Sequence, residues 1–148
     1  MQIGSKFTIG VHIITALEYF KDMDRVTSDF LAGSIGANPV IVRNVISQLR
    51  EAGIVNTQRG SSGAKLAKPL DEISLYDIYK AVDSVDSQEG LFHFHEHPNP
   101  ECPVGRNVHK VLESRLMDAQ KAMEEQLNKT TLEDILNGIS QAVQNEAK

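Results

Sequence analysis

The sequence predicts a mainly α-helical fold with a small two-stranded β-wing, that is, a winged helix-turn-helix followed by a long dimerisation helix. Three observations predict it. Two amphipathic segments, between 27 and 36 and between 39 and 53, are joined by a turn of about three residues, as in a helix-turn-helix. A hairpin pattern at 54–67 follows directly. An apolar stripe with near-heptad spacing then runs through 104–128.

The composition fits one medium-sized domain, or a small domain with an added assembly element. The chain has 148 residues, of which 41% are hydrophobic, and this is enough for a packed core. No apolar run approaches the ~18 residues that a membrane span requires, and the first residues do not form a signal-peptide pattern, so we expect no membrane partner. The single cysteine excludes an intramolecular disulfide, and a cytoplasmic location is expected.

The net charge of −5 is divided unevenly along the chain. Residues 1–70 carry eight Lys and Arg against five Asp and Glu, a net +3, whereas residues 71–148 carry seven against fifteen, a net −8. Between 38 and 68, five basic residues accompany the single acid Glu51. The acidic total therefore does not exclude nucleic acid, because the first half of the chain can meet phosphate.

The first two helices are predicted from apolar spacing and boundary residues. Residues 5–21 carry a broad apolar stripe at helical spacing, with Ser5 as the candidate N-cap. Thr27 or Ser28 is the candidate N-cap for the next, short helix, which Gly36 ends.

The third helix and the wing follow in the same way. Asn38 is an N-cap, and Pro39 at the first helical position loses no needed hydrogen bond. The apolar positions of this helix follow the i, i+3, i+4, i+7 pattern and are Val42, Val45, Ile46 and Leu49. Residues 54–58 and 64–67 are predicted as paired strands, with glycines at the hairpin tip between them.

The rest of the chain divides into four elements. Ser74 caps an amphipathic helix that reaches Val82, and glycines and prolines then interrupt any periodicity through 84–105. A long helix follows to about residue 128. The sequence Thr130-Thr131-Leu132-Glu133 is interpreted as a capping box that opens a last, short helix.

These elements predict a domain organisation in four parts. Residues 1–83 form the winged helix-turn-helix domain, 84–105 a sensor or linker loop, 106–139 the dimerisation helix with the short C-terminal helix, and 140–148 a polar, frayed tail.

Several motifs occur in a fixed order along nearly the whole chain. They are Ser5-Lys6, Val26-Thr27-Ser28, Leu49-Arg50-Glu51-Ala52-Gly53-Ile54-Val55, Arg59-Gly60, Leu66-Ala67, Ile73-Ser74-Leu75, Asp77-Ile78, Ala81-Val82-Asp83 and Thr131-Leu132-Glu133-Asp134-Ile135-Leu136. This ordered set resembles the Rrf-two family of bacterial transcriptional regulators, which includes IscR-, NsrR- and CymR-like proteins. The stretch 95–105 is most similar to the YwnA-like members.

The resemblance implies a homodimer, joined by the long helix, that binds a pseudo-palindromic double-stranded DNA operator. We therefore expect a sequence-specific transcriptional regulator, a repressor rather than an enzyme, with no small-molecule substrate. The apolar seam of the long helix supplies the candidate dimerisation residues, which are Val108, Leu112, Leu116, Ala119, Met123 and Leu127.

The face of the third helix opposite its apolar stripe supplies the candidate DNA-binding residues. They are Asn38, Val40, Ile41, Arg43, Asn44 and Ser47, joined by Arg59 and Lys65 of the wing. The resemblance implies that the positions at which family members contact DNA match all of these residues except Ser47 and Lys65. Arg43 suits guanine, Asn44 suits adenine, and Val40 or Ile41 suits a thymine methyl group. Arg59 is placed for a minor groove or phosphate, and Arg50, Lys65 and Lys68 for phosphate alone.

Residues 84–105, between the winged helix-turn-helix domain and the dimerisation helix, differ from the same segment of the best-known relatives. Cluster-binding members place three cysteines there, whereas this chain has only Cys102. Because an iron–sulfur cluster takes about four ligands, we expect no such cluster, and no cofactor, in one protomer.

Two interpretations of this segment stay open. Cys102, near the start of the long helix, is a candidate redox or electrophile sensor, or else a silent thiol at a dimer interface. His93, His95 and His97 alternate, so an extended chain would place them on one side, either as metal ligands or as solvated side chains.

Two other classes of function compete with DNA binding. A winged helix can also serve as a protein-interaction adaptor without DNA, which agrees with the acidic total charge. A small metalloenzyme at the His/Cys segment is the other rival, although no general acid or nucleophile stands at catalytic spacing.

Overall fold

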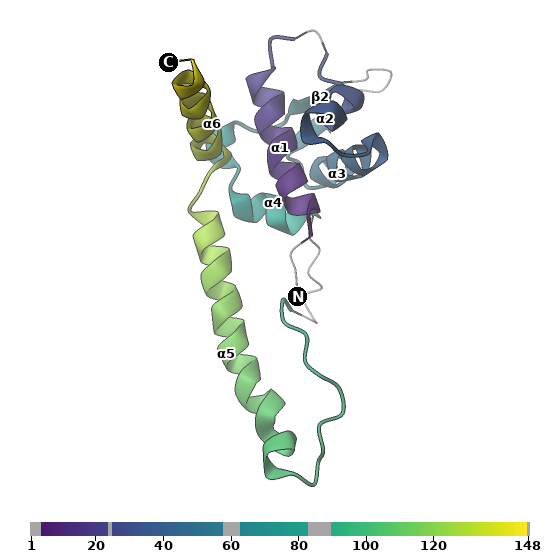
Figure 1. The fold of residues 1–148 in the computed structure, drawn as a ribbon, viewed down its shortest axis with the longest axis vertical. Helices are drawn as coiled ribbons and strands as arrows, with labels where there is room; N and C mark the ends of the chain where they lie inside the picture. Colours follow the sequence, from purple (N-terminus) through teal and green to yellow (C-terminus); the bar gives the residue numbers. More distant parts are fainter. Residues whose placement is uncertain (1–3, 24, 58–62, 83–89, 148) are drawn as a thin grey trace.

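The computed structural model describes residues 4–23, 25–57, 63–82 and 90–147. Its elements, in order, are α1 (Lys6–Tyr19), α2 (Ser28–Ile35), α3 (Pro39–Glu51), β1 (Val55–Thr57), β2 (Ala64–Leu66), the short 3-10 helix η1 (Leu70–Glu72), α4 (Leu75–Val82), α5 (Pro103–Asn128) and α6 (Leu132–Glu146). Helices α1 to α4, α6 and the small sheet form one globular head, from which α5 projects (Figure 1). The predicted fold class, helical with a two-stranded wing, is confirmed.

Local hydrogen bonds fix the helix-turn-helix. The Thr27 side chain accepts from the Phe30 N–H at the start of α2, and Gly36 ends α2 in the left-handed conformation at φ 77°. Asn38 then caps α3, because its Oδ1 accepts from the Val40 N–H across 2.8 Å. The turn between the helices is therefore as short as predicted.

The wing is a two-stranded antiparallel sheet in which Val55 pairs with Leu66 and Thr57 with Ala64. An isolated bridge between Thr27 and Gly63 ties its second strand to the start of α2. Two inward positions, Val55 and Ala64, are buried, so the sheet is fastened to the helices by apolar packing as well as by backbone hydrogen bonds.

One hydrophobic core fills the interior of the head. Its fully buried members come from every helix of the head and include Ile13, Leu31, Leu49, Ile78 and Leu132. Helices α1 and α4 approach each other closely at Gly10, where an added Cβ would stand 2.9 Å from Ile78 Cγ2. Glycine at this position lets the two helices meet.

The C-terminal helix joins the head through paired caps. Ser74 and Asp77 exchange hydrogen bonds at the start of α4, and Thr131 and Asp134 do the same at the start of α6. A bridge between Ser74 and Thr131 places these two helix starts side by side. Helix α6 then lies against α1.

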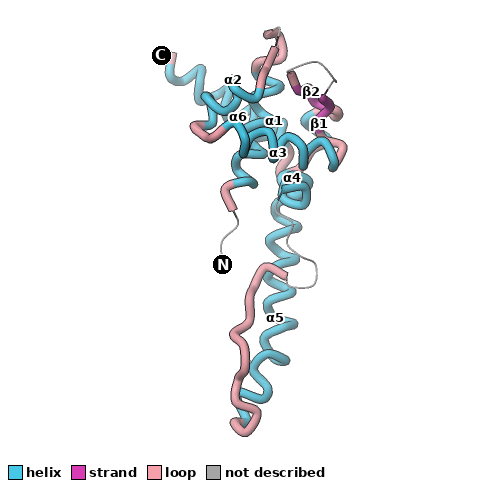
Figure 2. Tube along the Cα trace, turned by 90° about the vertical axis from the view of Figure 1, so that its right-hand side faces the viewer, coloured by secondary structure: helices cyan, strands magenta, loops and turns pink. Residues whose placement is uncertain are grey.

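Helix α5 is partnered by α4 near its C-terminal end and, along its length, by the segment 90–102, which runs beside it (Figures 1 and 2). The Leu91 N–H donates to Gln120 Oε1 of α5 across 3.0 Å. None of the 26 residues of α5 is buried. Within the described ranges, no helix combines the length and the apolarity needed to cross a membrane.

Three expectations need correction. The last helix is not short: it continues to Glu146, so most of the expected frayed tail at 140–148 is helical. Its capping box is formed by Thr131 with Asp134, one position later than expected. Ser5 precedes α1 but makes no side-chain cap, and instead its carbonyl accepts from the Thr8 hydroxyl.

Candidate nucleic-acid interface

Helix α3 divides cleanly into a buried and an exposed face. Val42, Val45, Ile46 and Leu49 are buried in the core. The opposite face carries Val40 and Ile41, exposed at 53% and 41%, together with exposed Arg43 and Asn44. Two large apolar side chains beside a guanidinium and an amide can read base edges and thymine methyl groups. Four of the residues selected from the sequence are therefore brought together on one accessible surface.

Two other selected residues are engaged within the protein. The Oδ1 atom of Asn38 is used as the α3 cap, so its amide has a structural role before any role at DNA. Ser47 is half-buried, and its hydroxyl accepts from Arg50 Nη2 across 3.3 Å. Both side chains therefore have hydrogen-bond partners within the protein, although Asn38 is exposed and its amide NH₂ group is not used by the cap.

The wing lies next to this helix. Lys65, on β2, is exposed and pairs in register with Asn56. Arg59, selected as the wing contact, lies outside the described residues. Arg50 of α3 reaches the wing directly, because its Nη1 donates to Thr57 Oγ1 across 3.1 Å. The sequence suggested only phosphate attraction for Arg50, and the tie to Thr57 was missed because nothing in the local pattern indicates it.

Cys102 occupies the N-cap position of α5 and is half-buried. Its carbonyl accepts from the Arg106 N–H, and the backbone N–H groups of Gly105 and Val104 hydrogen-bond its sulfur, which lowers the pKa of the thiol. A position at the N-terminus of a helix favours the same direction, because the helix dipole stabilises the thiolate. A Cβ at Gly105 would stand 2.6 Å from the Asn99 carbonyl oxygen, so only glycine allows this tight turn.

The three alternating histidines are exposed and are not brought together as a ligand set. His95 meets His109 of α5, with ring centroids 4.7 Å apart, and Phe94 packs on the same ring at 4.9 Å. His97 has φ 60°, which breaks the extended run, and lies 3.8 Å from the Glu96 carboxylate. The expectation that all three share one side is not met.

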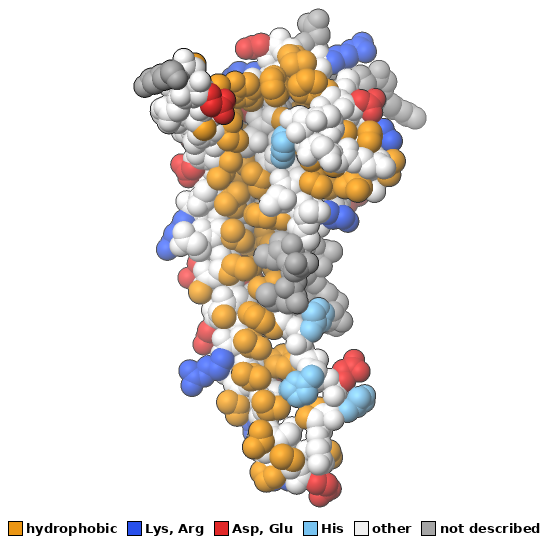
Figure 3. Space-filling model, viewed as in Figure 1, with side chains coloured by type: hydrophobic (Ala, Val, Ile, Leu, Met, Phe, Trp, Pro, Cys, Tyr) orange, Lys and Arg blue, Asp and Glu red, His pale blue; other side chains and the backbone are white. Residues whose placement is uncertain are grey.

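The candidate dimerisation stripe lies on α5. Val108, Leu116, Met123 and Leu127 are half-buried, whereas Leu112 and Ala119 are exposed. Apolar side chains form a nearly continuous band along α5 on the face drawn in Figure 3. A helix of this length with a long apolar band and no buried residue needs a partner surface.

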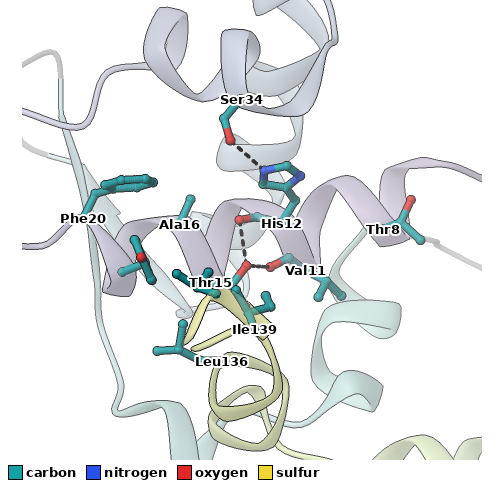
Figure 4. A pocket seen from close by; sticks show the side chains of 11 residues that line it. Thr8, Val11, His12, Thr15, Ala16, Phe20, Ser34, Leu136 and Ile139 are labelled. Carbon is teal, nitrogen blue, oxygen red and sulfur yellow. Dashed lines mark hydrogen bonds between the residues drawn. The ribbon is translucent and has the colours of Figure 1, made fainter. Parts of the chain in front are cut away.

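A second apolar surface, beside His12, is not predicted from the sequence. The ring of His12 bonds Ser34 of α2 at the edge of a groove between α1, α2 and α6 (Figure 4). Thr8, His12, Thr15 and Tyr19 form a weakly polar stripe at helical spacing, which does not by itself indicate a groove.

Comparisons with known proteins agree on one family. The family model described as "Rrf2: Iron-dependent Transcriptional regulator" matches residues 3–138. YwnA of Bacillus subtilis (strain 168), named as an HTH-type transcriptional regulator, is 39% identical over 136 residues, which cover 91% of this chain and 97% of that protein.

Two solved structures are similar over nearly their whole length. One, described as a DNA-binding protein, is 31% identical with a TM-score of 0.70, covering 89% of this chain and 99% of the other. The second, described as a transcriptional regulator from Lactobacillus plantarum, is 25% identical with a TM-score of 0.75, and 97% of each chain is covered.

The iron dependence in the family description does not fit the residues of this chain. Across the described ranges, no group of three or more His, Cys, Asp or Glu side chains is placed to hold a metal ion. The full sequence has one cysteine, whereas an iron–sulfur cluster takes about four ligands. No step of the function is therefore assigned to iron.

Proposed function

The chain belongs to the Rrf2 (Rrf-two) family of transcriptional regulators, and from this premise we propose that it binds a pseudo-palindromic operator as a homodimer and represses transcription. The family resemblance drawn from the ordered motifs is confirmed, including the similarity to YwnA. The relatives are DNA-binding regulators and not enzymes, which removes the metalloenzyme rival. The observation that carries the proposal is the exposed face of α3, flanked by the wing.

On this face we assign base contacts to Arg43 and Asn44. A guanidinium pairs bidentately with guanine and an amide with adenine, while Val40 and Ile41 provide apolar contact for thymine methyl groups. Lys65 of the wing supplies phosphate attraction, and Arg59 is proposed for the minor groove or the phosphate backbone on sequence grounds alone. Asn38 caps α3 and Ser47 accepts a hydrogen bond from Arg50, and both stay candidate DNA contacts beside these structural roles.

The homodimer is supported by α5. Its apolar band would be covered by the same band of a second copy, which the near-heptad spacing of Val108, Leu112, Leu116, Ala119, Met123 and Leu127 favours. Two copies related by a two-fold axis would present their α3 helices about one DNA turn apart, roughly 34–36 Å.

Cys102 is the proposed regulatory thiol. Its sulfur is stabilised as the thiolate by backbone N–H groups, and the segment that contains it packs along α5. Oxidation by a peroxide, which forms a sulfenic acid, would disturb this turn and through it the dimer helix. His93, His95 and His97 precede this turn on the same segment and, among the described residues, belong to no group placed to hold a metal ion.

The decisive experiment selects genomic DNA fragments with the purified full chain and measures affinity for the recovered site across a salt series. We expect binding that weakens steeply with salt, and an Arg43→Ala variant that loses specificity for the recovered site. Lys121→Ala on α5 removes the same charge far from α3 and should bind nearly as the parent does. Binding to a protein partner with no salt-dependent DNA affinity would favour the adaptor function instead.

A further inference from the structure

A groove of about 510 Å³ lies between α1, α2 and α6, away from the exposed face of α3. Its walls are mostly apolar and include Val11, Ala16 and Phe20 from one side and Leu136, Ile139 and Val143 from α6. In Figure 4 the side chains of α1 and α6 face each other across it. Ile139 and Val143 are each exposed at 40%, so the groove is open to solvent.

One polar pair stands in this apolar setting. His12 Nε2 and Ser34 Oγ are 2.9 Å apart, and they join α1 to the first helix of the helix-turn-helix (Figure 4). Burial lowers the pKa of His12, so the ring is neutral at physiological pH. A neutral imidazole has one donor and one acceptor nitrogen, and a serine hydroxyl has one proton and two lone pairs. One bond between them leaves donor and acceptor capacity for a third group.

The other polar groups nearby are already used or lie at the rim. The Thr15 hydroxyl bonds the Val11 and His12 carbonyl oxygens at 2.9 and 3.0 Å. Among the residues that the structure describes, no Asp, Glu, Lys or Arg lines the groove. A charged ligand would therefore lose its hydration with no opposite charge to meet it.

We propose that this groove is a binding site for a small, uncharged ligand with an apolar body and a single hydroxyl or carbonyl head group. The head group hydrogen-bonds the His12–Ser34 pair, and the body lies against Phe20, Leu136 and Ile139. The volume lies within the range of small-molecule sites, which combine apolar walls with a few convergent polar groups. A docked protein would need about 800 Å² on each side, more than this local groove provides. The site is separate from the proposed DNA contacts, so it stands whether or not those hold.

The test uses the full chain, labelled with ¹⁵N, and three probes in NMR titrations. The probes are 4-propylphenol, which carries a hydroxyl, propylbenzene, which has no head group, and 4-propylbenzoate, which is charged. We expect 4-propylphenol to shift the amide signals of residues around His12, Ser34 and Ile139. It should bind roughly 3- to 10-fold more tightly than propylbenzene, as one net hydrogen bond allows, and 4-propylbenzoate should bind most weakly.

Variants separate the polar pair from the apolar walls. Ser34→Ala should remove most of the preference for the phenol while leaving propylbenzene affinity unchanged. Ile139→Trp should fill the groove and abolish binding of both probes, whereas Val111→Trp, which adds the same ring on exposed α5, should not.

Four results would overturn the proposal. The first three are signal shifts confined to another surface, no shift up to the solubility limit of the probes, and unchanged affinity in Ile139→Trp. A fourth is loss of self-association by Val143→Arg in sedimentation together with no probe binding, because the groove would then be covered by a second copy of the chain.

Discussion

Arg50, one residue before the end of α3, donates from Nη1 to Thr57 Oγ1 at the end of β1 across 3.1 Å. Its Nη2 donates to Ser47 Oγ, one turn back on the same helix. A single guanidinium therefore adds a side-chain tie between α3 and the wing to the apolar packing of Val55 and Ala64. Because a planar fork makes both bonds at once, lysine could not replace it.

The first prediction concerns this bond. Thr57→Val keeps the β-branched shape and the charge of Arg50 but removes the acceptor, so the wing loses one of its ties to α3. Operator affinity should fall roughly 2- to 10-fold, as expected for the loss of about one net hydrogen bond, with an unchanged salt slope. Fluorescence anisotropy across a salt series measures both quantities. Equal affinity in parent and variant would show that the bond does not position the wing.

Asn38 provides a second prediction, because its side chain caps α3. Asn38→Ala should lower the free energy of unfolding by about 0.5–2 kcal/mol, since the Val40 N–H loses its acceptor. Asn38→Ser keeps a capping oxygen and should unfold nearly as the parent does in urea. If the serine variant retains both stability and operator affinity, Asn38 acts as a cap; if it keeps stability alone, the asparagine also reads DNA.

The sequence was most informative where a structural signal is local. The caps at Thr27 and Asn38 and the left-handed Gly36 each depend on partners within about four residues, and all three are found as predicted. The tie from Arg50 to Thr57 and the bond from His12 to Ser34 join different elements, so they depend on packing that periodicity does not encode.

The error at the C-terminus has a different cause. The polar composition after residue 139 suggested fraying, yet Ile135, Ile139 and Val143 continue at four-residue spacing beyond the expected end. The groove between α1, α2 and α6 is lined by the last two of these, and so it too was missed. The spacing of the apolar residues therefore predicts the end of this helix better than the average polarity of the segment does.

Gly10 carries a third prediction, on stability. Gly10→Ala would place a methyl group 2.9 Å from Ile78 Cγ2, and because Ile78 is fully buried it has no free space into which to move. The free energy of unfolding should fall by about 1–3 kcal/mol despite the better helix propensity of alanine. Gly33→Ala meets nothing within 4 Å and should be neutral or stabilising. Urea denaturation of both variants shows whether the clash with Ile78 or the helix propensity of alanine has the larger effect on the free energy of unfolding.

A fourth prediction tests the dimer helix. Leu116→Glu introduces a charge at the centre of the proposed seam, so sedimentation equilibrium should show a shift from dimer to monomer. Lys121→Glu is the control, since Lys121 is exposed and helical spacing places it opposite the seam on α5. A dimer that survives Leu116→Glu would show that the interface does not lie on this seam.

The fifth prediction joins Gly105 to the Cys102 thiol. Backbone N–H groups of Gly105 and Val104 lower the thiol pKa, so the thiolate is present at lower pH than for an ordinary cysteine. The rate of alkylation by iodoacetamide should therefore rise with a midpoint below that of a free thiol. Gly105→Ala would drive a methyl group to within 2.6 Å of the Asn99 carbonyl oxygen, displacing the turn and the N–H groups.

The midpoint of the alkylation profile in Gly105→Ala should accordingly move to higher pH, because the thiolate loses hydrogen bonds that the thiol does not need. Gly138→Ala, on the surface of α6 with nothing within 4 Å, should leave the profile unchanged. If the profile of Gly105→Ala coincides with that of the parent while circular dichroism shows an intact fold, the turn does not activate Cys102. The thiol would then have no structural basis for acting as a sensor.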